Sequence, residues 1–304
     1  MLTSEPISQR LPLLAQWRDY YTLTKPRVVQ LLVFTAIVGM FLATPGMVPW
    51  DVLVFGSLGI GLAAASGAAV NHVVDQRVDA QMTRTRGRPL PAGRVSDRDA
   101  FIFALVLGVV GLVLLAIAIN PLTAFLTFFS LIGYAVVYTI FLKRATPQNI
   151  VIGGAAGAAP PLLGWTAVTN EVSVDALLLF LIIFTWTPPH FWALAIARRD
   201  DYAKAGVPML PVTHGIEITK SFVLCYTVLL VNVTLLPYIT GMSGHVYLLG
   251  AILLGAGFLY YAGRLKFSAR TDIAMKTFGY SIIYLMALFS FLLLDHYVPI
   301  FLPQ

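Results

Sequence analysis

Charged side chains are scarce in this 304-residue chain. Asp, Glu, Lys and Arg make up 11% of it, against roughly 25% in an average soluble domain. Hydrophobic residues make up 58% and the mean hydropathy is +0.82. This composition excludes a soluble globular protein and predicts an integral membrane protein. The single cysteine excludes an intrachain disulfide and a metal site built from several cysteines.

Several signals of other functions and locations are also missing. The chain does not open on an apolar segment with a small-residue cleavage site, nor on an Arg- and Ser-rich stretch, so no signal or transit peptide is predicted. We therefore expect a bacterial (or archaeal) plasma membrane, the inner membrane in bacteria. The chain has no Gly-rich nucleotide loop and no evident Ser-based triad. We attribute the pI near 9.5 to positive loops on one membrane face, not to nucleic-acid binding.

Nine apolar stretches are long enough to cross a membrane, which takes about 20 residues. They are 28–44, 52–72, 99–119, 121–142, 148–168, 172–197, 216–240, 245–264 and 275–295. Pro and Gly lie near the breaks, where helices are expected to end. We expect an all-α integral membrane protein with an N-terminal segment, 1–27, and a single nine-helix transmembrane domain, 28–304.

The positive charges support this count. All 20 Lys and Arg lie in the N-terminal segment or in and beside the loops that follow even-numbered stretches, and the opposite loops have none. A missed or extra helix would break this segregation. By the positive-inside rule, the N-terminus is predicted to be cytoplasmic and the C-terminus to lie outside.

The most polar part of the chain, 70–99, follows the second stretch. Asn71, Asp75 and Asp79 recur every four residues, so on a helix they form one gently spiralling stripe. An arginine-rich loop that includes Arg84 and Arg88 comes next. The carboxylates could be ordinary interfacial charges. The regular spacing and the adjoining arginines favour a functional site, because charges near a span are costly and commonly functional.

A second polar cluster ends the sixth stretch. His190 follows two prolines that should kink the helix, and it is as well explained by a ligand or catalytic role as by packing. Beyond it come Asp200, Asp201, Tyr202 and Lys204. Four stretches separate the two clusters, so both face the same side, which Lys143 and Arg144 also reach. Asp200 and Asp201 alone would fit a solvated loop equally well.

Two acidic clusters on one face suggest a divalent metal bound to a diphosphate. Mg²⁺ prefers oxygen ligands and typically takes one or two carboxylates plus phosphate oxygens. Metal, Arg and Lys would stabilise the charge on a departing diphosphate, and apolar surroundings would keep water from a carbocation. Prenyl transfer satisfies these features together. A transporter, the non-enzymatic alternative, would spread its polar residues through the depth of the membrane.

The motif Asn71-x3-Asp75-x3-Asp79, followed by Arg84-Thr85-x2-Arg88-Pro89-Leu90-x2-Gly93, resembles the first motif of the UbiA superfamily of intramembrane prenyltransferases. Three segments resemble, more narrowly, the members that farnesylate haem: 138–169, 187–202 and 205–215. The resemblance runs over nearly the whole chain. It implies nine transmembrane helices around a central cavity. It also implies Mg²⁺-assisted transfer of farnesyl from farnesyl diphosphate to a vinyl group of haem b.

The resemblance also implies roles for single residues. Catalysis is expected to depend on Asp75, Asp79 and Asp201. Mg²⁺ is expected at Asn71, Asp75, Asp79, Asp200 and Asp201. The substrates are expected to contact Asn71, Arg84, Arg88, Lys143, Arg144, His190, Tyr202 and Lys204.

The second motif departs from the pattern of the wider superfamily. Quinone-type members begin it with an Asp where this chain has His190, and haem iron favours an imidazole, so we expect His190 to contact the haem. Prenylation of an aromatic acid or a quinone precursor by the same mechanism is the alternative. Haem A synthase and cytochrome oxidase assembly factors are candidate protein partners.

Overall fold

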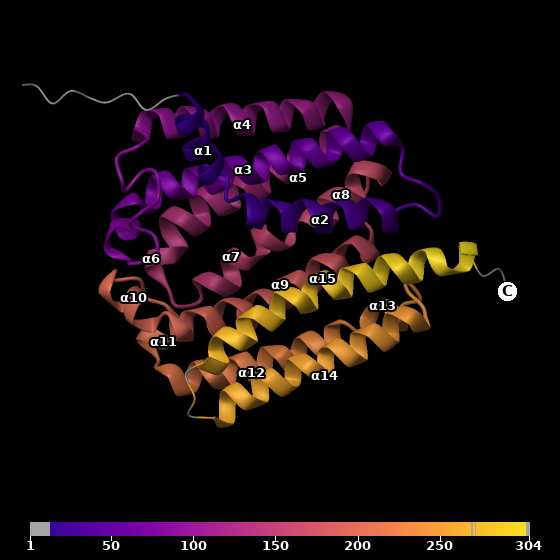
Figure 1. Cartoon of the computed structure of the whole chain (residues 1–304). Helices are drawn as coiled ribbons and strands as arrows, with labels where there is room; N and C mark the ends of the chain where they lie inside the picture. Colours follow the sequence, from indigo (N-terminus) through magenta and orange to yellow (C-terminus); the bar gives the residue numbers. More distant parts are fainter. Residues whose placement is uncertain (1–12, 269, 271, 302–304) are drawn as a thin grey trace, which may run out of the picture.

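The computed structural model describes residues 13–268, 270 and 272–301, and within them every regular element is helical (Figure 1). The α-helices are α1 (Leu13–Leu23), α2 (Pro26–Leu42), α3 (Trp50–Gln81), α4 (Asp97–Ala118), α5 (Pro121–Ile132), α6 (Lys143–Ala145), α7 (Asn149–Ala158), α8 (Pro160–Thr169), α9 (Val174–Ala197), α10 (Arg199–Lys204), α11 (Leu210–Thr213), α12 (Ile216–Val233), α13 (Leu236–Ile239), α14 (His245–Phe267) and α15 (Asp272–Phe301). A π-helix, η1 (Gly133–Leu142), joins α5 to α6.

Eight helical segments of the described chain are long and apolar enough to span a membrane, and the pair α1–α2, bent by 54°, makes a ninth when counted as one span. The bend falls at Lys25, whose backbone is left-handed (φ 49°), followed by Pro26 at the first position of α2. A proline fits this first position because its missing N–H has no helical partner there. Each predicted stretch matches one of these nine, which confirms the predicted fold.

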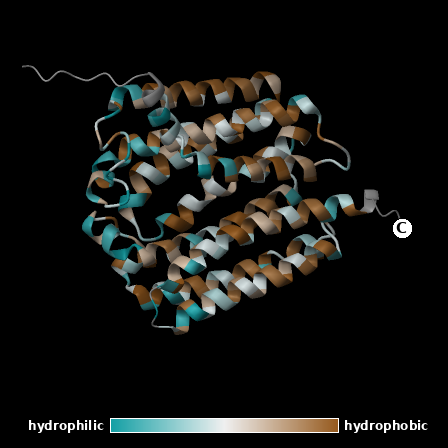
Figure 2. Cartoon of the chain, in the orientation of Figure 1, coloured by the Kyte–Doolittle hydropathy of each residue, from teal (hydrophilic) through white to brown (hydrophobic). Residues whose placement is uncertain are grey.

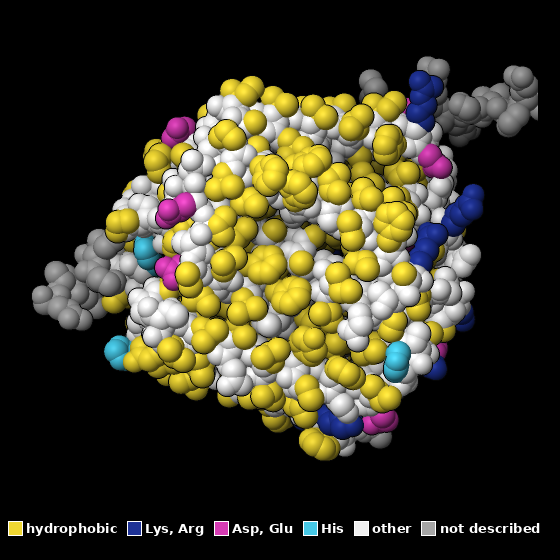
Figure 3. All heavy atoms as spheres, turned by 180° about the vertical axis from the view of Figure 1, so that it is seen from behind, with side chains coloured by type: hydrophobic (Ala, Val, Ile, Leu, Met, Phe, Trp, Pro, Cys, Tyr) yellow, Lys and Arg dark blue, Asp and Glu magenta, His cyan; other side chains and the backbone are white. Residues whose placement is uncertain are grey.

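Successive spans contact one another, and α15 returns to α2 and α9, so the helices form a closed ring. Hydrophilic residues gather at the end that holds α6, α10, α11 and the α3–α4 loop (Figure 2). From behind, hydrophobic side chains cover the middle of the molecule, and Lys and Arg lie toward one side (Figure 3). This distribution suits a belt of lipid around the apolar surface, with one strongly positive face.

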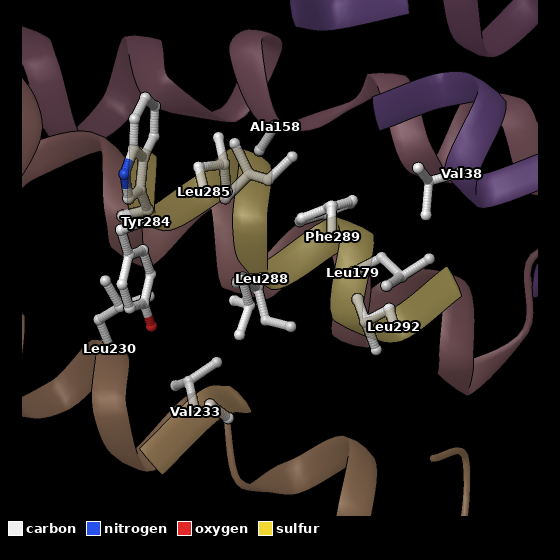
Figure 4. Close-up of a cluster of buried hydrophobic side chains, with 14 of the residues drawn as sticks. Val38, Ala158, Leu179, Leu230, Val233, Tyr284, Leu285, Leu288, Phe289 and Leu292 are labelled. Carbon is white, nitrogen blue, oxygen red and sulfur yellow. The ribbon is translucent and has the colours of Figure 1, made fainter. Parts of the chain in front are cut away.

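The largest core cluster joins the two halves of the chain (Figure 4). Leu288, Phe289 and Leu292 of α15 pack with α9 and α12, and the cluster also takes in Val38 of α2 and Ala158 of α7. Because these side chains come from both halves, this cluster ties the two halves of the ring together.

Glycines bring α2 and α8 close together. A Cβ on Gly39 would lie 2.2 Å from the carbonyl oxygen of Pro161, and one on Gly164 would lie 1.9 Å from that of Ala36. Only glycine permits backbones to approach so closely.

The two prolines predicted to kink the sixth stretch do not end its helix. Helix α9 continues through Pro188 and Pro189 to Ala197. The two prolines lack amide protons, so the carbonyls four residues earlier, on Phe184 and Thr185, lose their helical donors.

Candidate functional site

The acidic stripe lies on the last turns of α3, which continues nine residues beyond the predicted end of the second stretch. Asn71, Asp75 and Asp79 are only 5%, 2% and 4% exposed. A buried carboxylate is costly unless it is paired and hydrogen-bonded. The stripe therefore depends on the groups that surround it.

Each residue of the stripe is held by a different cation. Lys143 Nζ donates to Asp75 Oδ2 at 2.5 Å, and an Arg88 guanidinium nitrogen donates to Asp79 Oδ2 at 2.6 Å. Lys25 Nζ donates to Asn71 Oδ1. The three cations come from the α1–α2 bend, the α3–α4 loop and the start of α6, so folding is needed to assemble them.

Asp75 is the most enclosed member of the stripe. Its Oδ2 also accepts a hydrogen bond from Asn71 Nδ2 at 2.8 Å, and that amide lies 3.4 Å from Thr139 Oγ1. Its Oδ1 is buried and finds no partner among the residues that the structure describes. Thr139 and Lys143 both reach α3 because the wide turn of a π-helix keeps residues four to five apart on one face.

The α3–α4 loop is tied down where it carries Arg88. Thr85 Oγ1 donates to the carbonyl of Asp79 at 2.8 Å, and Gln76 Nε2 donates to the carbonyl of Leu90 at 3.4 Å. Thr85 and Leu90 are almost fully buried. These contacts hold the guanidinium of Arg88 against the stripe, whereas Arg84 is exposed.

The second cluster meets the first at Tyr202. Burial raises the pKa of the Tyr202 hydroxyl, and the positive charges of Arg84 and Arg88 oppose that rise, so both arginines lie within electrostatic reach. Val78 of α3 and Tyr202 also pack against the same hydrophobic cluster, which includes Trp192. The sequence correctly placed the two clusters on one face.

Other members of the second cluster lie farther from the stripe. Asp200 has an 84% exposed side chain and pairs only with Arg199, at 3.5 Å, among the described residues. Arg144 and Lys204 are exposed too, and Asp201 is half-buried beside Tyr202. The metal-binding and substrate-binding roles expected for these residues stay predictions.

The stripe suits a metal that arrives with an anion better than a closed metal site. No three His, Cys, Asp or Glu side chains converge anywhere in the described parts of the chain. Two carboxylates, one amide oxygen and the unpartnered Asp75 Oδ1 offer the oxygen donors that Mg²⁺ takes together with phosphate oxygens. The residues therefore fit Mg²⁺ bound jointly with a diphosphate.

Two residues beside the stripe were missed in the sequence. Lys25 was counted only as a topology charge, although the Lys-Pro pair at the start of a span marks the bend that brings it to Asn71. His72 lies next to Asn71 on α3 and is only 2% exposed. Neither of its ring nitrogens has a partner among the described residues. Nothing in the sequence distinguished it from an interfacial histidine.

His190 is buried on α9, 8% exposed, and its ring lies between two aromatic side chains. It stacks on Trp186 at 4.2 Å and on Phe278 at 4.6 Å between ring centroids, and Nδ1 lies 2.6 Å from Ser281 Oγ. Nε2 makes no hydrogen bond to a described residue and is not among the side-chain atoms sealed from solvent. This nitrogen has no partner within the described part of the chain.

A ring of apolar helices with buried acids and cations at one end is the arrangement expected of an intramembrane enzyme with an anionic substrate. Residues 32–293 match the model of the UbiA prenyltransferase family, so the chain belongs to this family of enzymes.

Its relatives are close in sequence. It is 62% identical over 282 residues to "Protoheme IX farnesyltransferase" of Thioalkalivibrio sulfidiphilus, covering 93% of each chain. It is 59% identical over 289 residues to the protein of the same name from Nitrosococcus oceani, covering 95% of this chain and 97% of that one.

Solved structures share the fold. A digeranylgeranylglyceryl phosphate synthase aligns with a TM-score of 0.78 at 20% identity, over 93% of this chain and 99% of that one. A UbiA homologue from Archaeoglobus fulgidus, bound to GPP and Mg²⁺, aligns with a TM-score of 0.61 at 18% identity, over 90% and 99%.

Proposed function

We propose that this enzyme transfers a farnesyl group from farnesyl diphosphate to a vinyl side chain of haem b, giving haem O and diphosphate. The observation that carries the proposal is the buried stripe Asn71–Asp75–Asp79 with its three cations. The names of the relatives that are about 60% identical support haem as the acceptor. Binding of GPP and Mg²⁺ by a structural neighbour supports a prenyl diphosphate as the donor.

The stripe would bind the diphosphate through an exchange of partners. Asn71, Asp75 and Asp79 would hold Mg²⁺, which when bound acts as a Lewis acid toward the leaving diphosphate. Lys143 and Arg88, released from their carboxylates, then bind phosphate oxygens. Charge-assisted bonds of this kind stabilise the negative charge that builds up as the diphosphate leaves.

The outer cations extend this binding site. Lys25 donates to the neutral amide of Asn71 and not to a carboxylate. Its ammonium could therefore turn from this amide to a phosphate oxygen. Arg84 and Tyr202 are placed to contact the diphosphate, and Arg144 and Lys204 add positive charge on the same face. Of the two acids in the second cluster, half-buried Asp201 is better placed than Asp200 to join the metal site.

On the acceptor side, we propose that His190 contacts the haem through Nε2. The π electrons of the vinyl group form a bond to C1 of the farnesyl chain as its C–O bond to diphosphate breaks. The cation left beside the porphyrin ring takes up water, which loses a proton and leaves a hydroxyl group. Trp186 and Phe278 keep the surroundings of His190 apolar, which protects the reactive carbocation from early capture by water.

We place the enzyme in the bacterial inner membrane with the N-terminus in the cytoplasm and the C-terminus outside. The support is the segregation of all Lys and Arg to the N-terminal segment and one set of loops, read with the positive-inside rule. Hydrophilic residues also gather at the end of the molecule that carries the α3–α4 loop (Figure 2). Haem A synthase and oxidase assembly factors are the protein partners to test.

The proposal is tested with purified protein, farnesyl diphosphate and Mg²⁺, given either haem b or 4-hydroxybenzoate. Mass spectrometry should show haem heavier by one farnesyl and one hydroxyl group, and unchanged 4-hydroxybenzoate. The reverse result would support an aromatic-acid prenyltransferase. His190→Ala should alter the absorption spectrum of bound haem, and an unchanged spectrum would remove the proposed contact.

A further inference from the structure

Ser281 of α15 lies against His190 although 91 residues separate them in the chain. Its side chain is fully buried, and its Oγ is 2.6 Å from His190 Nδ1 and 2.6 Å from the carbonyl oxygen of Phe278. Its own carbonyl accepts a hydrogen bond from Trp186 Nε1 at 2.8 Å. Ser281 therefore contacts His190 directly and is also hydrogen-bonded to Trp186 and to the backbone of Phe278, the two residues whose rings stack on the imidazole.

These distances assign the protons. Two oxygen atoms 2.6 Å apart need a hydrogen between them, and the carbonyl of Phe278 has none to give. The hydroxyl of Ser281 therefore donates to that carbonyl. With its only hydrogen used, the hydroxyl can offer His190 only a lone pair, so Nδ1 must carry the proton and donate to Ser281 Oγ. Neutral imidazole has one N–H, which leaves a lone pair on Nε2.

The orientation of the ring is fixed as well as its tautomer. Trp186 and Phe278 lie nearly parallel to the imidazole, at interplanar angles of 18° and 27°. Trp186 is itself held by the carbonyl of Ser281. Rotation of the ring would break the Nδ1 hydrogen bond and both stacks together, so Nε2 keeps one direction.

We propose that Ser281 is a positioning residue for the acceptor: it holds His190 as the Nδ1–H tautomer, with the Nε2 lone pair free to bind the iron of haem b. The inference rests on the proposed function and deepens it. Histidines that bind metals usually donate their other N–H to a fixed acceptor, and loss of that acceptor weakens metal binding by about 10- to 100-fold. In the neutral ring, proton donation from Nε2 to a carboxylate or phosphate would require the opposite tautomer and leave the short Oγ–carbonyl contact without a hydrogen.

The test compares Ser281→Ala with two other variants of the full-length protein in detergent. Ser281→Thr keeps a hydroxyl at the same place. Thr277→Val removes another buried hydroxyl of α15, one turn earlier, which among the described residues bonds only to the backbone carbonyls of Ile273 and Tyr261. Haem b is titrated into each protein and the absorption spectrum recorded. The KM for haem, the KM for farnesyl diphosphate and the melting temperature are then measured.

We expect Ser281→Ala to weaken haem binding and raise the KM for haem by about 10- to 100-fold, with an altered spectrum and an unchanged KM for farnesyl diphosphate. Ser281→Thr and Thr277→Val should resemble the wild type. If Ser281→Ala also resembles the wild type while His190→Ala loses haem, the positioning role is refuted and the proposed function stands. Equal effects on both KM values, with a loss of stability beyond that of Thr277→Val, would show a structural role instead. Absence of haem binding and haem product in the wild type would refute the proposed function itself.

Discussion

The substitution Asp75→Asn separates charge from shape at the centre of the site. It keeps the size of the side chain but leaves the ammonium of Lys143, whose Nζ lies 2.5 Å from Asp75, without its counter-charge. The two side chains are 3% and 15% exposed, so this is a buried pair. Removing one partner of such a pair costs about 3–5 kcal/mol of folding free energy. Turnover should fall by about 10²- to 10³-fold, because metal-based charge stabilisation contributes several kcal/mol.

A second substitution, at Lys143, separates the loss of stability from the loss of turnover. Lys143→Met alone should also destabilise the protein, because it leaves Asp75 charged and unpaired. The double variant removes both charges and should recover about 0.5–3 kcal/mol relative to the sum of the single variants. Turnover should not recover in the double variant, because the proposed mechanism uses Asp75 to hold the metal and Lys143 to bind the leaving diphosphate.

Two measurements decide the outcome. Unfolding in mixed detergent micelles gives the free energies for the four proteins, and diphosphate release at limiting Mg²⁺ gives their turnover. Near-normal turnover of Asp75→Asn would contradict the metal-binding role of the stripe. Joint recovery of stability and turnover in the double variant would mean that the pair is only structural.

The remaining predictions concern the metal and the opposite end of the molecule. Chelation of Mg²⁺ should abolish farnesyl transfer and leave the melting temperature unchanged, because Lys143 and Arg88 hold the carboxylates when no metal is bound; a clear drop in melting temperature would indicate a structural metal. Asp295→Ala should keep activity but lower stability by about 0.5–2 kcal/mol, because this carboxylate accepts the backbone N–H groups of Gly244 and Tyr247 at the start of α14. Thermal unfolding with a parallel activity assay checks it, and lost activity at full stability would contradict the structural role.

The fold was largely predictable because it depends on local patterns. Long apolar stretches and the one-sided distribution of Lys and Arg follow directly from the cost of polar groups in lipid, and they gave the correct nine spans. The stripe was predictable for the same reason, since a spacing of four residues matches the helical turn. The structure buries the stripe and pairs it with Arg88 and Lys143, and the roles expected for these residues stay predictions.

The rest of the site depends on contacts between distant segments. Lys25 reaches Asn71 only because the backbone bends at Lys25 itself, and Ser281 meets His190 only because α15 packs on α9. Neither contact has a local pattern in the sequence. Asp200 was expected at the metal site, but its side chain is 84% exposed. A short acidic run beside a span does not reveal which of its side chains points to solvent.

The central claim is that a farnesyl group joins haem at a site that depends on Asp75. The most direct measurement gives the purified enzyme haem b and 4-hydroxybenzoate together, with farnesyl diphosphate and Mg²⁺, and weighs both acceptors by mass spectrometry. We predict that haem gains one farnesyl and one hydroxyl group, that 4-hydroxybenzoate stays unchanged, and that Asp75→Asn forms almost no product. Farnesylated 4-hydroxybenzoate with unchanged haem, or equal product from Asp75→Asn, would contradict the claim.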